Sequence, residues 1–548
     1  PYGGRPSPLP SFRLRSLDMS ERRAVLRPAV GLSVLLVLLI LLPFVLGYLG
    51  TPAGYVFRGT LKPSGDESQY LAAVRMGMRG AWLWHDPYMA QAPPPILMYP
   101  LYLLAGHVAA PFTNQVGAVF ALFHAVSALV LAAALWWMGA LFLDRRRRAW
   151  FVAFSLLAGG LYWLVALLAI GNLNPIGLSA MGTERLSAFT ALLMEAHVAL
   201  GTAGQVMAFV GILGSSPALG RAGRRNGAVL GCAGVALVGL SLPVLLPLTL
   251  VVVAAIALER LAANQRAGGG GTGALWFLSI AALICLPGLA FGAYYYHVFS
   301  VGPWSRGGFQ GVPASTWAEK LLTWGVLLPF GWWGLRRSGP RVRPLAHALA
   351  IWVGCSVVGS FLPFWQGDRL TLGVSVPIGA LFALGAAEIG MHEVRARRRL
   401  LLLGAGPICH YLFLCIALLD GASPNLYAAV EEDRAARWIA AHVQPGEVVL
   451  APFGFANTLP TIAPVQVPAG HGYQTLDIVR RQHELNEVYG GHRTPAQRLA
   501  AARATGADLL VYDRLDTANG RFDARTLPGT RILYSSANIA VLSLLPRN

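Results

Sequence analysis

Residues 59–108 read GTLKPSGDESQYLAAVRMGMRGAWLWHDPYMAQAPPPILMYPLYLLAGHV, and this stretch decides the fold. It holds the adjacent carboxylates Asp66 and Glu67, then a polar run, then Trp and Tyr residues, and then three prolines before an apolar half-helix. Such a composition is typical of a segment at a membrane surface, where Trp and Tyr lie among the headgroups and charges lie just above the apolar phase. A carboxylate pair at that depth is placed to act on a molecule held in the membrane.

The composition of the 548 residues indicates a polytopic membrane protein. Hydrophobic residues make up 55% and charged residues only 12%, and the mean hydropathy is +0.54. Residues 420–548 carry 12 Lys+Arg and 12 Asp+Glu, so the whole net charge of +18 lies in the apolar part. The charge therefore reports membrane topology, and no nucleic-acid partner is expected. The five cysteines all lie in apolar runs and show no disulfide or metal-site spacing.

The N-terminal region, residues 1–28, is expected to be a leader and a cytoplasmic segment. Its first eighteen residues contain no Met, and Arg22, Arg23 and Arg27 precede the first apolar span at 29–49. That span is about 20 residues long, the length of a transmembrane helix. It favours an uncleaved anchor over the alternative of a cleaved signal peptide.

Five arginine clusters predict the topology, because positive residues favour the cytoplasmic side. The clusters are Arg145–Arg148, Arg221 to Arg225, Arg260 to Arg266, Arg336 to Arg343 and Arg395 to Arg399. An even number of crossings must separate neighbouring clusters, which gives about eleven transmembrane helices between residues 29 and 420. After the first, they are expected near 117–143, 149–170, 197–214, 227–241, 243–258, 274–297, 317–334, 346–364, 370–390 and 400–419. The short apolar run at 96–112 is then re-entrant or juxtamembrane.

This even number of crossings places four segments on the same face of the membrane, predicted to be the exterior. They are the loop at 50–116 (loop one), the loop at 171–196, the loop at 298–316 and everything after residue 420. The C-terminal part, 421–548, alternates helix and strand patterns, which predicts a soluble α/β domain. It contains no phosphate-binding glycine loop, and its His471 is expected to anchor a loop.

Polar residues at the exterior edge of the spans are candidate ligand contacts. The loop at 171–196 carries Glu184, and His197 opens the following span. Gln366, Asp368 and Arg369 lie together at the start of another span. An arginine at this depth suits a lipid phosphate, because its guanidinium can donate two parallel hydrogen bonds. The alternative is that Arg369 snorkels to the interface with Asp368 as its local partner.

The pattern Asp66-Glu67-x-x-Tyr70, followed by Gly-Ala-Trp at 80–82 and PPPILMYPLYLL at 93–104, resembles the start of the GT-C superfamily. These are membrane glycosyltransferases that use polyprenyl phosphates, and the likeness is to the protein-mannosyl and aminoarabinose transferase branch and to uncharacterised bacterial multi-pass proteins of this type. Shorter matches cover much of residues 29–545. They are Thr183-Glu184, His197, Gln366-x-x-Arg369-x-x-x-Gly373, and Gly470-His471 with Thr475 and Asp477.

The resemblance implies a GT-C-like helical domain that transfers a sugar from a lipid phosphate on the exterior face. It implies catalytic carboxylates among Asp66, Glu67 and Glu184, with one acting as the base. The implied substrate-binding residues are Tyr70, Trp82, His85, His197, Gln366 and Arg369. The cofactor is open: a divalent cation held by Asp66 and Glu184, if one is present, could offset the phosphate charge, as Arg369 could.

Each candidate also has a purely structural interpretation. Asp66 and Glu67 suit the first turn of a helix at 68–79, where negative charge is favourable. Glu184 could be a solvated loop acid, and His197 a histidine at the end of a span. The aromatic cluster from Trp82 to Tyr88 could anchor the chain at the interface rather than bind a sugar.

The resemblance implies a lipid-linked sugar donor and membrane lipids as partners. The expected location is the bacterial plasma membrane, with the C-terminal domain on the exterior, periplasmic side. The competing function is a non-catalytic multi-pass protein, either a transporter or an envelope assembly factor. The spans contain few ionisable residues, which disfavours ion-coupled transport but not an assembly factor.

Overall fold

The structure of the chain is a computed structural model. It describes residues 19–62, 65–161, 187–215, 221–266, 268, 271–306, 316–362, 367–388, 395, 398–399, 402–421, 426–490, 493–514 and 523–544.

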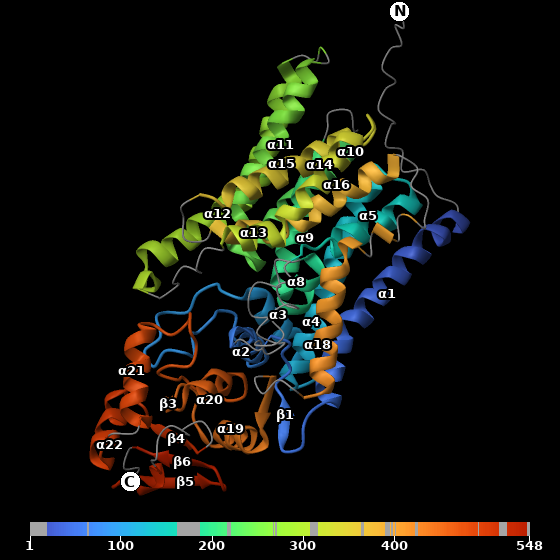
Figure 1. Cartoon of the computed structure of the whole chain (residues 1–548). Helices are drawn as coiled ribbons and strands as arrows, with labels where there is room; N and C mark the ends of the chain where they lie inside the picture. The colour runs from blue at the N-terminus through green and yellow to red at the C-terminus, as the bar shows by residue number, and fades with distance from the viewer. Residues whose placement is uncertain are drawn as a thin grey trace, which may run out of the picture.

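Helices make up the larger part of the molecule, above the C-terminal domain in Figure 1. They are α1 Met19–Leu49, α4 Val116–Ala140, α5 Arg145–Leu157, α8 Ala188–Met194, α9 Ala196–Gly214, α10 Arg221–Ser241, α11 Leu246–Arg266, α12 Gly271–Tyr296, α13 Trp317–Thr323, α14 Leu328–Arg337, α15 Arg343–Gly359, α16 Ser375–Glu388 and α18 Ala405–Leu419. Short turns connect some of them: η2 Pro243–Leu245, the π-helical η3 His297–Val301, η4 Pro303–Arg306, η5 Gly325–Leu327 and η6 Gly367–Thr371.

The helical part has the length and composition of a multi-pass membrane domain. Six segments are long and apolar enough to span a bilayer: Ala29–Leu49, Val116–Ala140, Ala196–Gly214, Pro243–Arg266, Leu275–Val301 and Gly367–Glu388. Shorter apolar helices are Pro100–Ala109, Arg343–Gly359 and Ala405–Leu419. The polytopic helical class is thus confirmed. The segment expected to cross at 317–334 is divided into α13, η5 and α14, and Pro329, which lacks an amide hydrogen, begins α14.

Glycines let α9 and α10 pack with their backbones in contact. A side chain at Gly204 would meet the carbonyl oxygen of Gly234 at 2.6 Å, and one at Gly211 would meet the backbone of Gly231. Small residues allow this close approach between membrane helices, where apolar lipid gives no hydrophobic drive to associate. These contacts pack α9 closely against α10, and α9 carries His197 near its start.

Loop one forms a short strand and two helices beneath the membrane domain. They are β1 Tyr55–Phe57, α2 Asp66–Met78 and α3 Pro100–Ala109. The ten residues of α3 extend about 15 Å, half the thickness of the hydrocarbon core. The prediction that the 96–112 run does not cross the membrane therefore agrees with its observed length.

The C-terminal domain is α/β, as predicted. Its elements are β2 Tyr427–Ala429, α19 Val430–His442, β3 Val449–Leu450, α20 Phe453–Thr458, η8 Leu459–Thr461, α21 Ile478–Tyr489, α22 Pro495–Ala504, β4 Leu509–Asp513, η9 Ala524–Thr526, β5 Arg531–Ser535 and β6 Ile539–Ser543. The four-stranded sheet has the order β3-β4-β6-β5, in which β3 and β4 are parallel and the other pairs are antiparallel. Strands β4 and β6 are buried throughout and form the centre of this domain.

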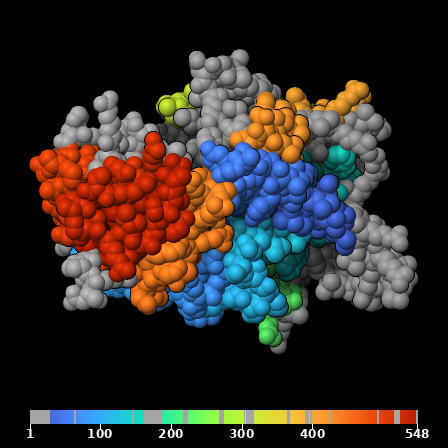
Figure 2. All heavy atoms as spheres, turned by 90° about the horizontal axis from the view of Figure 1, so that it is seen from below, coloured from blue at the N-terminus to red at the C-terminus, as the bar shows by residue number. Residues whose placement is uncertain are grey.

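Loop one and the C-terminal domain are joined by a second, two-stranded sheet. Strand β1 pairs antiparallel with β2, with Tyr55 opposite Ala429. Both parts therefore lie at the same end of the helical domain, and α11 extends toward the other end (Figure 1). Seen from below, the red C-terminal domain covers one side of this end, and blue segments of the chain are visible beside it (Figure 2). Loop one thus contacts the C-terminal domain while it lies beneath the helical domain.

Helices α2 and α3 depend on a glycine contact that can be tested. A methyl group at Gly77 would overlap the carbonyl oxygen of Leu103. We expect Gly77→Ala to destabilise the protein by about 2 kcal/mol, because well-packed backbones cannot move apart cheaply. The matched control is Gly354→Ala in α15, where a methyl group meets nothing within 4 Å. Thermal unfolding in detergent should show a lower midpoint for the first variant alone, and equal midpoints would contradict the packing argument.

Candidate active site

The polar helix α2 is the centre of the candidate site. Nine of its thirteen residues are buried, although its sequence is no more apolar than that of a surface helix. Asp66 and Glu67 lie in its first turn, where the helix dipole favours negative charge. The structural interpretation of this pair as a helix start is therefore correct, and the question becomes what each carboxylate does in addition.

Glu67 organises the loop that precedes α2. Its side chain is 1% exposed, and Oε2 accepts hydrogen bonds from the backbone N–H groups of Leu61, at 2.9 Å, and Lys62, at 2.8 Å. Burial raises the pKa of Glu67 to about 8, against the opposing effect of these N–H groups and the Lys62 ammonium. One oxygen is thus fully engaged in shaping the backbone.

Lys62 connects two carboxylates from distant parts of the chain. Its Nζ lies 2.6 Å from Oε1 of Glu195 and 3.6 Å from Oδ2 of Asp66. Burial alone would raise the pKa of Glu195, but Lys62, His197 and Arg369 outweigh it and lower that pKa to about 2. Glu195 is therefore a firmly ionised counter-ion at the junction of α8 and α9.

An aromatic group packs beside this charged cluster. Nδ1 of His197 lies 3.0 Å from the hydroxyl of Tyr102, and its Nε2 lies 3.7 Å from Glu195. Tyr70 of α2 stacks on Tyr102, with ring centroids 4.8 Å apart, and also contacts His197. Two residues proposed from the sequence, Tyr70 and His197, are thus brought together with the loop-one carboxylates.

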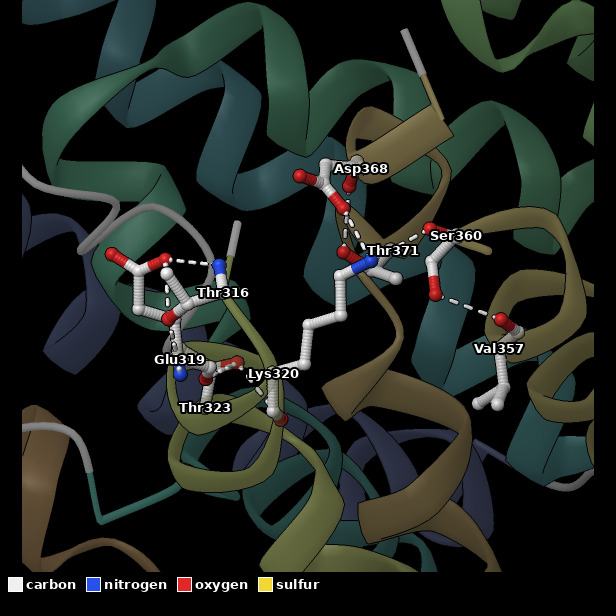
Figure 3. Close-up of polar contacts among 8 residues, drawn as sticks. All are labelled: Thr316, Glu319, Lys320, Thr323, Val357, Ser360, Asp368 and Thr371. Carbon is white, nitrogen blue, oxygen red and sulfur yellow. Dashed lines mark hydrogen bonds and ion pairs between the residues drawn. The ribbon is translucent and has the colours of Figure 1, made fainter. Parts of the chain in front are cut away.

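Arg369 approaches the same cluster from η6. It is partly buried, and its positive charge lowers the pKa of Glu195. Within the described residues no carboxylate lies within ion-pair distance of its guanidinium. Asp368 instead pairs with Lys320, with Nζ and Oδ1 2.9 Å apart (Figure 3). The structure does not show the local Asp368–Arg369 pair weighed as an alternative from the sequence.

A cavity of about 800 Å³ lies between loop one, the start of α4 and the C-terminal domain. Lys62, Asp66 and Glu67 line it from loop one, and Asn457 and His471 line it from the C-terminal domain. The Asp66 side chain is 29% exposed, more than the buried Glu67 or Glu195. Asp66 is therefore the carboxylate of this group best placed to meet a molecule in the cavity.

The C-terminal domain contributes directly to the walls around α2. Asn457 accepts a hydrogen bond from the Ser68 hydroxyl at 2.6 Å and donates to the carbonyls of Gly65 and Gly470. Gln474 donates to Gln69 Oε1 at 2.7 Å. These contacts mean that the C-terminal domain helps to position the first turns of the helix that carries Asp66.

His471 anchors its loop, as predicted, and also faces the site. Its Nδ1 accepts hydrogen bonds from the backbone N–H groups of Tyr473 and Gln474, at 3.2 and 3.3 Å. Burial lowers its pKa to about 4, although Asp66 acts in the opposite direction. The neutral ring therefore carries its proton on Nε2, and this nitrogen has no hydrogen-bond partner among the described residues.

Other candidates from the sequence lie apart from this cluster. Trp82 is 63% exposed and stacks on His107, and His85 is also exposed. Neither residue lines the cavity. Glu184 and Gln366 lie outside the described residues. Within the part of the chain that is described, no three His, Cys, Asp or Glu side chains gather as a metal site would require.

Two residues of the cluster escaped the sequence analysis. Lys62 was not proposed, although it is one of only two lysines in the chain. Glu195 was not proposed either, although it stands two residues before His197 at the start of a span. Scarcity of lysine and of acidic residues near apolar runs was the available signal for both, because an isolated charge at a membrane boundary needs a partner.

Comparison with known proteins identifies the fold. No family model matches the sequence, and no curated protein is significantly similar to it. Among solved structures, the Archaeoglobus fulgidus oligosaccharyltransferase superposes with a TM-score of 0.53 and 13% identity, over 93% of this chain and 73% of that one. ArnT from Cupriavidus metallidurans, solved in the apo state and bound to undecaprenyl phosphate, superposes with a TM-score of 0.50 over 94% of this chain and 98% of that one, at 15% and 14% identity.

The mycobacterial arabinofuranosyltransferase AftD is also similar, with a TM-score of 0.51 and 14% identity, over 93% of this chain and 41% of that one. These three proteins are GT-C membrane glycosyltransferases, and the chain has their fold. At such low identity the likeness establishes architecture alone. The chemistry must be argued from the residues of this chain.

The raised pKa of Glu67 predicts a pH-dependent effect on stability. Because the folded-state pKa of about 8 lies above the ordinary value of 4.5, Glu67 ionises first in the unfolded chain, and the stability of the fold falls as pH rises between these values. Glu67→Gln keeps an oxygen for the two N–H groups and does not ionise. We expect thermal unfolding to show that the midpoint of the variant, minus that of the parent, becomes larger from pH 5 to pH 8. A pH-independent difference would show that the pKa of Glu67 in the folded state is not raised above its ordinary value.

Two substitutions can distinguish the role of Nδ1 of His471, which accepts the loop hydrogen bonds, from that of Nε2. His471→Asn places an oxygen near the position of Nδ1, so it should keep the bonds from Tyr473 and Gln474 and the parental stability. His471→Gln places its amide near Nε2 instead, and should lose about 1 kcal/mol, the value of a typical hydrogen bond. Thermal unfolding of both variants tests this order. The reverse order would mean that Nε2 holds the loop.

Proposed function

We propose that the protein is an integral-membrane glycosyltransferase that transfers a sugar from a polyprenyl-phosphate donor to an acceptor on the exterior face. The main support for this proposal is the position of Asp66, which lines the cavity and lies next to the Lys62–Glu195 pair. Arg369 is near enough for its charge to act on Glu195. A partly exposed carboxylate and a cation without a carboxylate partner among the described residues are thereby combined at one end of a GT-C fold.

The donor is proposed to bind through its phosphate. A polyprenyl chain would lie in the membrane and present its phosphate near the start of the segment Gly367–Glu388, where Arg369 lies. The guanidinium would bind two phosphate oxygens and offset the charge that develops as the phosphate leaves. The complex of ArnT with undecaprenyl phosphate supports this class of donor. A divalent cation at Asp66 is the alternative way to offset this charge, with Glu184 as a second ligand.

Asp66 is proposed to be the base. The acceptor group must lose a proton as it attacks the sugar carbon, and a carboxylate within hydrogen-bond distance removes that proton. Glu195 is committed to Lys62, and one oxygen of Glu67 is committed to the backbone, so neither is as available. The cavity beside Asp66 is large enough for an acceptor and is closed on one side by the C-terminal domain.

We further propose the bacterial plasma membrane as the location, with loop one and the C-terminal domain on the exterior side. This orientation is supported by the arginine clusters, which the positive-inside rule assigns to the cytoplasm. It also places the proposed acceptor cavity outside the cell, beside the leaflet in which a flipped lipid-linked sugar would arrive.

The test is transfer from undecaprenyl-phosphate-linked hexoses and pentoses by the full-length protein in nanodiscs, with membrane extracts as the source of acceptors. Asp66→Asn should lower the rate by about 10²- to 10⁴-fold, the contribution of a general base. The control is Asp144→Asn, which keeps an N-cap side chain on α5 and should leave the rate unchanged. Near-parental transfer by Asp66→Asn combined with inactivity of Glu184→Gln would assign the base to the loop at 171–196. No transfer from any donor would favour a non-catalytic protein.

A further inference from the structure

A second lysine–carboxylate pair lies outside the cluster around Asp66. Lys320 of α13 and Asp368 of η6 are both largely buried, with side chains 11% and 9% exposed. Nζ of Lys320 also donates a 2.7 Å hydrogen bond to the carbonyl of Ser360, at the end of α15 (Figure 3). The same Nζ lies 4.5 Å from the centroid of the Phe361 ring. One side chain thus connects α13, α15 and η6.

The backbone on both sides of this pair is held independently of it. Helix α13 starts with a capping box, in which Thr316 Oγ1 accepts from the Glu319 N–H and Glu319 Oε2 accepts from the Thr316 N–H. The turn of η6 is closed by the hydroxyl of Thr371, which donates to the carbonyl of Asp368 at 2.7 Å. Loss of the Lys320 charge would therefore leave both elements formed.

Stability alone is a poor reason for this pair. The free energy lost by removing two charges from water offsets much of their mutual attraction. Apolar residues of similar size often give a fold the same stability. The neighbouring residue suggests another reason. Asp368 directly precedes Arg369, and successive residues of a 3₁₀-helix project about 120° apart. Asp368 projects toward Lys320, while the Arg369 charge acts on Glu195 and Tyr99.

We propose that Lys320 is a positioning residue that binds the Asp368 carboxylate and so prevents it from pairing with Arg369, which leaves the guanidinium available to a lipid phosphate. The inference rests on the proposed function, in which Arg369 binds the donor. Without Lys320, the ionised Asp368 would be the nearest anion to Arg369 in the sequence, and it would compete with the phosphate for the same donors.

The experiment measures undecaprenyl phosphate binding to the full-length protein in nanodiscs by native mass spectrometry. Lys320→Met keeps the aliphatic length and removes the charge, and should weaken binding about tenfold, as for one lost charge-assisted hydrogen bond. Asp368→Asn alone should bind as the parent does. The double variant should return to within about threefold of the parent, a strong non-additivity between contacting residues. Lys320→Arg, which keeps the charge, should bind normally.

If Lys320 acted only through packing, undecaprenyl phosphate binding would follow a different pattern across the variants. The double variant would then bind no better than Lys320→Met, and this result would overturn the proposal. Thermal unfolding of the same four proteins shows whether any loss follows stability instead. A loss of binding that tracks the unfolding midpoint across the series would also count against a charge-specific role.

A second readout needs no lipid. Phenylglyoxal modifies guanidinium groups that are not held by a carboxylate, and peptide mass spectrometry reports modification of Arg369 itself. Arg369 should react more slowly in Lys320→Met than in the parent and recover in the double variant. Equal reactivity in all variants would refute the proposal. If Arg369→Ala binds undecaprenyl phosphate like the parent while this reactivity pattern holds, the donor contact is wrong and the role of Lys320 stands.

Discussion

The rest of the structure depends on the burial of a helix that is not apolar. Most residues of α2 are buried, so each polar side chain on it needs a partner to offset the cost of leaving water. The partners come from both domains: Gln69 and Ser68 reach the C-terminal domain, and Tyr70 packs on His197 of α9 in the membrane domain. Helix α2 therefore ties the two domains together, and the position of Asp66 depends on both.

Buried charges in the chain also have partners that offset the cost of leaving water. The chain has two lysines, and both are buried against carboxylates: Lys62 against Glu195 and Asp66, and Lys320 against Asp368. A buried charge without a counter-ion is expensive, so pairing is expected of each. Arg369 differs, since no described carboxylate lies at ion-pair distance from it. The cost of burying its charge is reduced by the attraction of Glu195 and by partial exposure.

The sequence predicted the parts of the structure that follow from local pattern. The apolar runs predicted a polytopic helical domain, and the alternating patterns after residue 420 predicted an α/β domain, whose central strands begin at Leu509 and Ile539. The contacts between distant residues could not be predicted this way. Lys62 and Glu195 stand 133 positions apart, and Ser68 and Asn457 389 positions apart, so only the tertiary fold brings them together. The span predicted near 317–334 consists of three shorter elements, because Pro329 has no amide hydrogen to continue the helical hydrogen bonds.

The three carboxylates around Lys62 have different roles because their surroundings differ. Glu67 is buried and accepts two backbone N–H groups, so burial raises its pKa and ties it to the loop. Glu195 is also enclosed but faces Lys62 at 2.6 Å, so its pKa falls and its ionised form is favoured. Asp66 is the most exposed of the three and lies at the cavity wall. A base must exchange its proton with a bound molecule, which requires access as well as charge. Access is what separates Asp66 from the other two, and this difference arises because the first turn of α2 points Glu67 into the loop and Asp66 toward the C-terminal domain.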